Sequence, residues 1–564
     1  MKPHIKRCYF EYLIALVFIV TLFFNCSSPT GGGVTVSTNS NGINGHIPLV
    51  VNNNPKLSDT LSRPAFDRFS WNTFIALNWP LHQDTTARGI PLNPDEDTTF
   101  LNMHNTTPVV WTSYKNQYDL YGNKKNRSRP TAWDSTSSYK TLCGGSTKLR
   151  AVFGRTKFNT LPVEEADEAF SVPLIDQDTN YVLYEIRYNK THYDFVRGGT
   201  KDSTWRYLKK NLVAYQMNNH DKANMPASDT TRKNPQGALM MKAAWREVTD
   251  DEAKNYYVIN EKVYDPISGT CIKKQLGLVG LHFAQKLKGF RQWVWSSFEH
   301  INNVPGQGSN GLPYSFNNND SIPVTSNGFA NKPKNSIIIH DKSKRIPVQV
   351  TRLDSIPTTP NDSSTMHINS EYQKRLAKTV WKNYQLVITQ WPTAGDTTKL
   401  WVIDKGEYPE DAGTPFPAYN CVNTTMETYF QSRADARDAR DGVDPKTMGI
   451  IRDTKGNSCM GCHYTAAQTD YSWSMQLRSY ITKVDTPSFA KDIVPMFYQW
   501  RPQMLNVGIG LDLTDSIDLV SDSMAIKKAI SATGNGQMPP TPYPKLTKEE
   551  INTYHNWLKN IKKN

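Results

Sequence analysis

The most constraining feature of this sequence is a five-residue motif, Cys459-Met460-Gly461-Cys462-His463. Two thiols three positions apart can both reach the vinyl groups on one edge of a haem and form thioethers, and the adjacent histidine then lies under the iron. A chain with such a group has to fold around a cofactor. The motif therefore predicts one covalently attached haem c, bound through Cys459 and Cys462, with His463 as an iron ligand.

Two other uses of a Cys-x-x-Cys pair fit the sequence less well. A thioredoxin-like redox pair needs a βαβ surrounding and a helix N-terminus, which the flanking stretches 455–458 and 464–467 do not indicate. A structural zinc site needs a second pair of ligands nearby, and the sequence offers none there. Haem attachment is the interpretation that the motif favours.

The second axial ligand of the iron is left open by the sequence. Met538 and Met475 are the preferred candidates. The choice matters for electron transfer, because a methionine ligand raises the iron potential relative to a histidine ligand. His282 and His300, beside strand-like runs, are the alternatives. The remaining possibility is that the second axial position of the iron is open or is occupied by solvent.

The first residues, 1–26, have the form of an export signal. Basic residues precede a mostly apolar run, Tyr12–Phe24, which is too short to span a membrane as a helix. Cys26 follows it and precedes a Ser/Gly-rich stretch, which resembles a bacterial lipoprotein signal. That resemblance implies an acylated Cys26 at the mature N-terminus and a periplasm-facing membrane lipoprotein. An ordinary cleaved signal and an uncleaved anchor remain the alternatives.

The charge balance bears on the partners of the protein. The formal net charge is +13, and the densest basic run is 124–129, but acidic residues are interleaved almost everywhere else. A dispersed basic surface is the simplest interpretation, and an acidic redox partner is the alternative. We do not expect nucleic acid to be a partner.

Three further cysteines, Cys143, Cys271 and Cys421, are neither in the motif nor in the leader. Disulfides form in exported proteins. We expect one bridge with a spare thiol, or buried thiols, and the sequence does not choose between these.

The chain is predicted to be an α+β multidomain protein. A large mainly β region, pictured as two stacked sheets, would precede a small all-α unit. Alternation at Val182, Tyr184, Ile186 and Tyr188 predicts a strand after a turn. The predicted parts are a signal at 1–26, a flexible tether at 27–64, the β domain at 65–425, a haem-attachment segment at 426–485 and the all-α unit at 486–564.

Short helices are expected at both ends of the β domain. Phe66, Phe69, Phe74 and Leu77 approximate helical spacing before Trp79-Pro80. Near the other end, a helix is expected over Met426–Arg440. In the all-α unit, a capping box and an apolar stripe predict the last helix: Thr547, Glu550, Ile551, Tyr554, Leu558 and Ile561.

The C-terminal unit resembles small bacterial cytochrome c domains. Phe489–Phe497 is similar to their first helix, and Gly534–Pro540 is similar to their axial-methionine loop. In those domains Cys-x-x-Cys-His follows the first helix, whereas here Tyr498–Gln503 contains neither Cys nor His. The unit is then either a cytochrome fold with no haem of its own or a cover over the haem at Cys459 that contributes Met538.

Residues 65–480 resemble a group of large bacterial cytochrome c family proteins. The resemblance rests on Phe74–Pro80, Gly280–His282, Trp293–His300 and Ser458–His463, of which only the last is specific. It implies haem binding and electron transfer and gives no substrate.

Three functions follow as hypotheses. The first is an electron carrier that exchanges electrons with other redox proteins. The second is a haem-dependent oxidoreductase, for which His282 and His300 are the acid–base candidates in a pocket of the β domain. The third is a binding module that presents aromatic side chains at its surface, for which the candidates are Trp293, Trp295 and Trp391.

Overall fold

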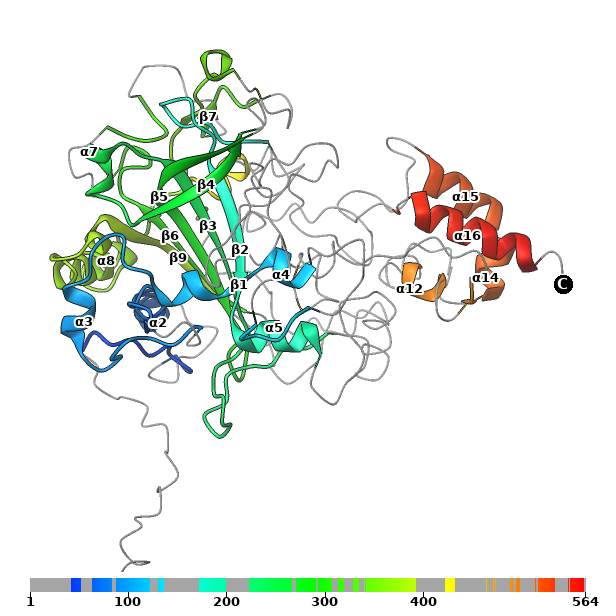
Figure 1. The fold of residues 1–564 in the computed structure, drawn as a ribbon, viewed down its shortest axis with the longest axis horizontal. Helices are drawn as coiled ribbons and strands as arrows, with labels where there is room; N and C mark the ends of the chain where they lie inside the picture. The colour runs from blue at the N-terminus through cyan, green and yellow to red at the C-terminus, as the bar shows by residue number, and fades with distance from the viewer. Residues whose placement is uncertain are drawn as a thin grey trace, which may run out of the picture. The chain divides into compact units, whose positions relative to one another are not determined.

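The largest element of the computed structural model is a seven-stranded antiparallel sheet (Figure 1). Its order is β1-β2-β3-β5-β6-β9, and β4 pairs with β5 off this path. The strands are β1 (Lys115–Asn116), β2 (Leu183–Tyr188), β3 (Leu239–Glu247), β4 (Val258–Asp265), β5 (Thr270–Gln285), β6 (Val294–His300) and β9 (Tyr384–Gln390). The structure describes residues 42–51, 63–83, 88–121, 130–135, 172–198, 223–265, 270–290, 293–306, 313–318, 328–333, 339, 341–391, 421–431, 463, 470, 472, 487–489, 493–497, 513, 516–532, 546 and 548–561.

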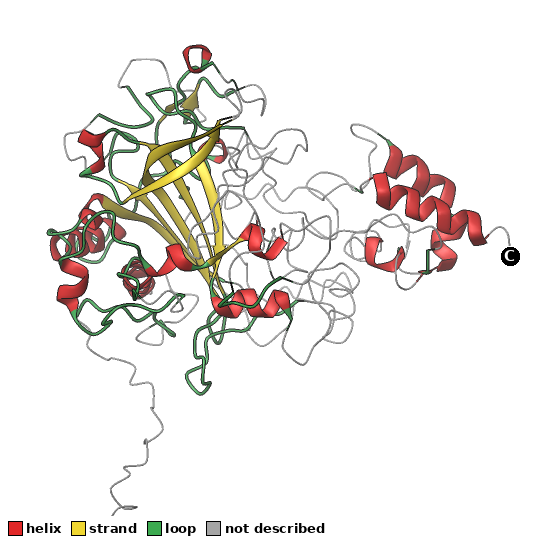
Figure 2. Cartoon of the chain, in the orientation of Figure 1, coloured by secondary structure: helices red, strands yellow, loops and turns green. Residues whose placement is uncertain are grey.

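Helices join the sheet in the same region, which confirms the α+β class (Figure 2). Two of them, α2 (Arg63–Leu77) and α8 (Thr365–Arg375), contact β9 and each other. The other short elements of this region are α3 (Asp97–Leu101), η2 (Val110–Ser113), α4 (Gln117–Tyr121), α5 (Lys190–Arg197), α7 (Asp250–Ala253), β7 (Phe329–Ala330), η3 (Lys342–Lys344), β8 (Gln349–Val350), η4 (Val380–Asn383) and η6 (Thr428–Phe430).

The main core lies between α2 and the sheet. Phe74 stacks on Phe298 of β6 with ring centroids 4.2 Å apart, and Trp71 meets the same ring edge-on at 5.0 Å. The aromatic spacing in the sequence therefore marked a real helix, and Trp79-Pro80 follows its last residue, Leu77.

The expectation of two stacked sheets was wrong for the described residues. The second sheet there has only two strands, β7 and β8, of two residues each. Every residue of β6 and β9 is buried, so both faces of the main sheet need cover. Helix α2 covers one face, and the segment 421–431 packs on the other through Met426.

The folded part begins earlier than the predicted boundary at residue 65. Ile47 and Val51, inside the predicted tether 27–64, are buried. The carbonyl of Pro48 accepts a hydrogen bond from Gln285 Nε2 at 2.7 Å, and that of Leu49 accepts one from Ser228 Oγ at 2.6 Å. Buried apolar side chains and paired carbonyls make the described residues 43–51 part of the fold.

The predicted helix over Met426–Arg440 is replaced, as far as residue 431, by the single 3-10 turn η6. Thr428 Oγ1 donates to the Thr424 carbonyl, and Asn423 accepts from Thr425, so side chains satisfy this backbone locally. Residues 432–440 lie outside the described part of the chain.

Four helices near the C-terminus share an apolar cluster of their own. Ile493 and Phe497 are buried in it together with Tyr554 and Leu558, as the apolar spacing predicted. Thr547 of the predicted capping box lies outside the described residues. The helices are α12 (Val494–Phe497), α14 (Ser516–Ser521), α15 (Ser523–Ser531) and α16 (Lys548–Ile561).

Candidate functional site

His463 is the one residue of the motif that the structure describes. Its ring lies against Trp295 of β6, with centroids 4.3 Å apart and planes at 49°. Trp295 is 6% exposed, and His463 itself is half-buried. Cys459 and Cys462 lie outside the described residues.

A second contact anchors the chain seven positions later, at Asp470. Its Oδ1 lies 2.6 Å from Lys286 Nζ, and its Oδ2 accepts the Met225 amide at 2.7 Å. Its carbonyl accepts Trp293 Nε1 at 2.8 Å. The side chains of Lys286 and Asp470 are 4% and 5% exposed, which makes this a buried ion pair with further hydrogen bonds. The motif segment is thereby fastened to the sheet at two described points.

His282 lies on the same face of the sheet as Trp295. In the register of β5 and β6, His282 pairs with Ser297 and Ala284 pairs with Trp295. Directly paired residues share a face, and positions two apart on a strand share it too. His282 and Trp295 are therefore diagonal neighbours below His463.

The two ring nitrogens of His282 have different surroundings. Nδ1 lies 3.2 Å from Glu427 Oε1. Nε2 is buried and has no hydrogen-bond partner within the described part of the chain. One nitrogen is thus oriented by a carboxylate, and the other carries an unused lone pair or proton.

Burial keeps this imidazole neutral. Burial, and to a lesser degree the positive charges of Lys242 and His463, lower the pKa of His282 to about 3. Lys242 is the cross-strand partner of His282 on β3. A neutral imidazole is the form that binds a metal.

Other polar atoms on this face also lack partners among the residues that the structure describes. Trp295 Nε1 is buried without an acceptor, and the amide nitrogen and oxygen of Gln390 are both unpaired within the described residues. Gln390 pairs with Trp295 across β6 and β9, so the two side chains are neighbours. Buried polar groups are nearly always satisfied. A bound group with iron to ligate and carboxylates to accept N–H bonds, such as haem, fits this donor set.

The segment 421–431 brings Glu427 to His282. Asn423 Nδ2 donates to Ser297 Oγ at 3.1 Å and to the Phe298 carbonyl at 2.8 Å. A Cβ on Gly280 would lie 2.3 Å from Thr425 Oγ1, so only glycine lets the segment approach β5 this closely.

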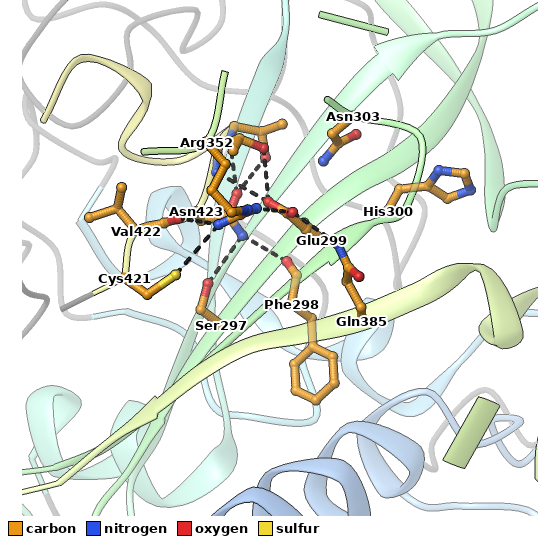
Figure 3. A network of polar contacts seen from close by, with 12 residues as sticks. Ser297, Phe298, Glu299, His300, Asn303, Arg352, Gln385, Cys421, Val422 and Asn423 are labelled. Atoms are coloured by element: carbon orange, nitrogen blue, oxygen red, sulfur yellow. Dashed lines mark hydrogen bonds and ion pairs between the residues drawn. The ribbon is translucent and has the colours of Figure 1, made fainter. Parts of the chain in front are cut away.

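A buried polar network fixes the start of this segment (Figure 3). The Arg352 guanidinium contacts Glu299, and it donates to the Val422 carbonyl at 3.0 Å. Glu299 Oε2 accepts from Thr424 Oγ1 at 2.8 Å. Cys421 Sγ lies 3.5 Å from Arg352, and burial raises the pKa of this thiol to about 11. The thiol is therefore protonated and inert at neutral pH.

The cysteines outside the motif include both a free thiol and a disulfide-bonded residue, which is one of the two arrangements that the sequence left open. Cys421 is a free buried thiol. Cys271 is disulfide-bonded, and its partner is outside the described residues. Cys143 is also outside them.

Both ring nitrogens of His300 are hydrogen-bonded within the fold. Its Nε2 lies 3.0 Å from the Asn255 carbonyl, and its Nδ1 accepts the Asn302 amide at 3.2 Å. Its ring stacks on Tyr256 with centroids 4.0 Å apart. His300 has a structural role and is removed from the candidate ligands.

The three tryptophans of the binding-module hypothesis are buried, with Trp293 at 0%, Trp295 at 6% and Trp391 at 1% exposure. None presents its ring at a surface. Phe66 stacks on Trp391 with centroids 4.0 Å apart, as core residues do.

Glu427 and Gln390 are site residues that the sequence did not single out. Both are far from the motif along the chain, and no local pattern marks them; only the strand alternation around His282 could have indicated the face. The remaining predicted site residues lie outside the described part of the chain: Cys26, Met475 and Met538, as does the basic run 124–129.

The described residues hold no group of three or more His, Cys, Asp or Glu side chains placed to bind a metal ion. Within the described residues, no helix has the length and apolar character needed to cross a membrane.

Comparison with known proteins gave no match, whether to a family model, to a curated protein or to a solved structure.

Proposed function

We propose that this protein is an exported mono-haem c-type cytochrome that transfers electrons. Haem c would be held by thioethers to Cys459 and Cys462, with His463 as an axial ligand. The observation that carries the proposal is the position of His463. It lies on buried Trp295, among buried polar atoms that have no partner in the described residues.

The bound haem would supply a one-electron couple between ferrous and ferric iron. The residues of this chain hold and shield it. Trp295 supports one face of the His463 ring. The buried Lys286–Asp470 pair fixes the chain beyond the motif and restricts its movement. With haem bound, a restrained site of this kind would keep structural reorganisation small during electron transfer.

The setting of the protein is part of the proposal. The leader and Cys26 support a periplasm-facing lipoprotein, since haem attachment of this type takes place outside the cytoplasm. Its partners would be other redox proteins, and the net charge of +13 favours acidic ones. The four helices described near the C-terminus would belong to a cytochrome c-like unit, for which their shared apolar cluster is the support.

The test is expression of the full chain in a host that assembles c-type cytochromes, followed by haem staining after denaturing electrophoresis. Wild type should retain haem, and the C459S/C462S double variant should lose all covalent haem. C421S is the matched control, because Cys421 is a buried thiol outside the motif. It should keep its haem. Wild type without covalent haem would overturn the proposal.

A further inference from the structure

We propose that His282, oriented by Glu427, is the second axial ligand of the haem iron. This inference rests on the proposed function, because it concerns the same haem. It assigns a bis-histidine site in place of a histidine–methionine or an open one.

The first support is position. His282 and Trp295 are diagonal neighbours on one face of β5 and β6, and His463 lies on Trp295. The register places His282 on the face where Trp295 contacts His463, which brings both imidazoles to one side of the sheet, as a ligand pair for one iron requires.

The second support is orientation. Histidines that bind metals commonly donate their other ring nitrogen to a carboxylate, which fixes the tautomer and the ring plane. Glu427 Oε1 lies 3.2 Å from Nδ1 of His282, which leaves Nε2 as the coordinating atom. Glu427 Oε2 accepts the Asn423 amide at 3.0 Å, so the carboxylate is itself held at both oxygens.

The third support is the rigidity of this arrangement. Asn423 is bonded to β6, and Thr424 is bonded to Glu299, which is paired with Arg352 (Figure 3). These contacts hold the segment on the strand next to His282. They give Glu427 a fixed position without any contribution from the haem.

The other buried histidines fit the role less well. His300 uses both ring nitrogens within the fold. His192 has two unpartnered nitrogens, but its ring stacks on Tyr188 with centroids 4.4 Å apart, and no carboxylate orients it in the described residues. His192 is therefore a matched control: it is buried and neutral like His282, with pKa lowered to about 3 by burial.

Two imidazole ligands have a functional consequence. They give iron a lower potential than a histidine–methionine pair, and they leave no position for a small molecule. Such a site passes electrons and does not bind substrate at the metal.

The experiment compares the haem-loaded full chain of wild type, H282A, H282M and H192A. Covalent haem is quantified first. Electron paramagnetic resonance of the ferric form, carbon monoxide binding to the ferrous form and potentiometric titration follow. Wild type and H192A should be low-spin with a bis-imidazole signal and should not bind carbon monoxide. H282A should become high-spin and bind carbon monoxide, and added imidazole should reverse both changes. H282M should stay low-spin with a raised potential.

Several outcomes overturn the assignment. H282A that keeps covalent haem and the wild-type spectrum would show that another group ligates the iron. Carbon monoxide binding by wild type would show an open site, and loss of the low-spin signal in H192A alone would assign His192. Should H282A fail to fold, H282M decides through its potential, which must rise. Absence of covalent haem in wild type is a separate result and overturns the proposed function instead.

Discussion

The buried polar groups at the two ends of the paired strands β5 and β6 differ in how completely they are hydrogen-bonded. At one end, His300 bonds through both nitrogens and Glu299 accepts from Thr424 and pairs with Arg352. At the other end, His282 Nε2 and Trp295 Nε1 have no partner in the described residues. The same sheet therefore has an end whose histidine is fully paired within the fold, here called the self-sufficient end, and an end whose histidine is not, here called the incomplete end. One amide oxygen beside Glu299, Oε1 of Gln385, is also without a partner in the described residues.

The difference separates a structural role from a binding role. An unpaired buried polar group costs about 1–3 kcal/mol, so a fold keeps several together only if something else pairs with them. The incomplete end is also where His463 lies. The motif histidine and the unpaired polar groups lie at the same end of the sheet. This identifies that end as the candidate haem site.

The largest effect is expected at the anchor of the incomplete end. D470A removes the partner of buried Lys286 and the acceptor of the Met225 amide. Breaking such a pair should cost about 4 kcal/mol of unfolding free energy. Denaturant unfolding followed by circular dichroism measures it. A loss below about 1 kcal/mol would mean that the anchor does not hold the motif segment.

A substitution at the self-sufficient end should lower the unfolding free energy without changing the haem spectrum. H300A loses the stack on Tyr256 and two hydrogen bonds, to Asn255 and Asn302, which should cost about 3 kcal/mol. The haem spectrum of the folded variant should match wild type. A changed spin state in H300A would contradict the division between the two ends.

A smaller effect is expected where the segment carrying Glu427 crosses β5. G280A places a Cβ 2.3 Å from Thr425 Oγ1 and should cost about 2 kcal/mol by overpacking. The same shift should move Glu427 and alter the iron potential. An unfolding free energy equal to wild type would show that the segment is not tightly seated.

The smallest effect is a pH dependence. Burial lowers the pKa of His300 from its ordinary value of 6.5 to about 3, so between these two pH values the unfolded chain binds a proton that the folded chain does not. The contribution of His300 to the unfolding free energy is therefore fully present above pH 6.5 and falls as the pH decreases towards 3. The slope should be about 1.4 kcal/mol per pH unit.

Unfolding free energies of wild type and H300A between pH 7 and pH 5 isolate this contribution, because other titrating groups cancel in the difference. The gap between the two proteins should narrow as the pH falls. A constant gap would show that His300 is not buried as a neutral ring.

Local patterns predicted the parts of this fold that depend on nearby residues. Alternating side chains marked β2, and aromatic spacing before Trp79-Pro80 marked α2. The motif marked His463 by spacing alone. These features depend on backbone period and on proline, which act within a few residues.

The rest depends on pairing between distant segments. The register of β5 and β6 sets which side chains join His282, and Glu427 arrives from a segment held by Arg352 and Gly280. No periodicity encodes such contacts. The two-sheet expectation failed for the same reason, since a helix and a strand can cover a buried sheet face equally well.

The central claim is that the motif carries one covalent haem, and the mature wild-type protein tests it directly. Its intact mass, measured under denaturing conditions together with a pyridine haemochrome spectrum, should exceed that of the polypeptide and any lipid by one haem. A haemochrome of the type formed by thioether-linked haem should accompany that mass. The mass of the polypeptide and lipid alone, with no haemochrome, would contradict the account.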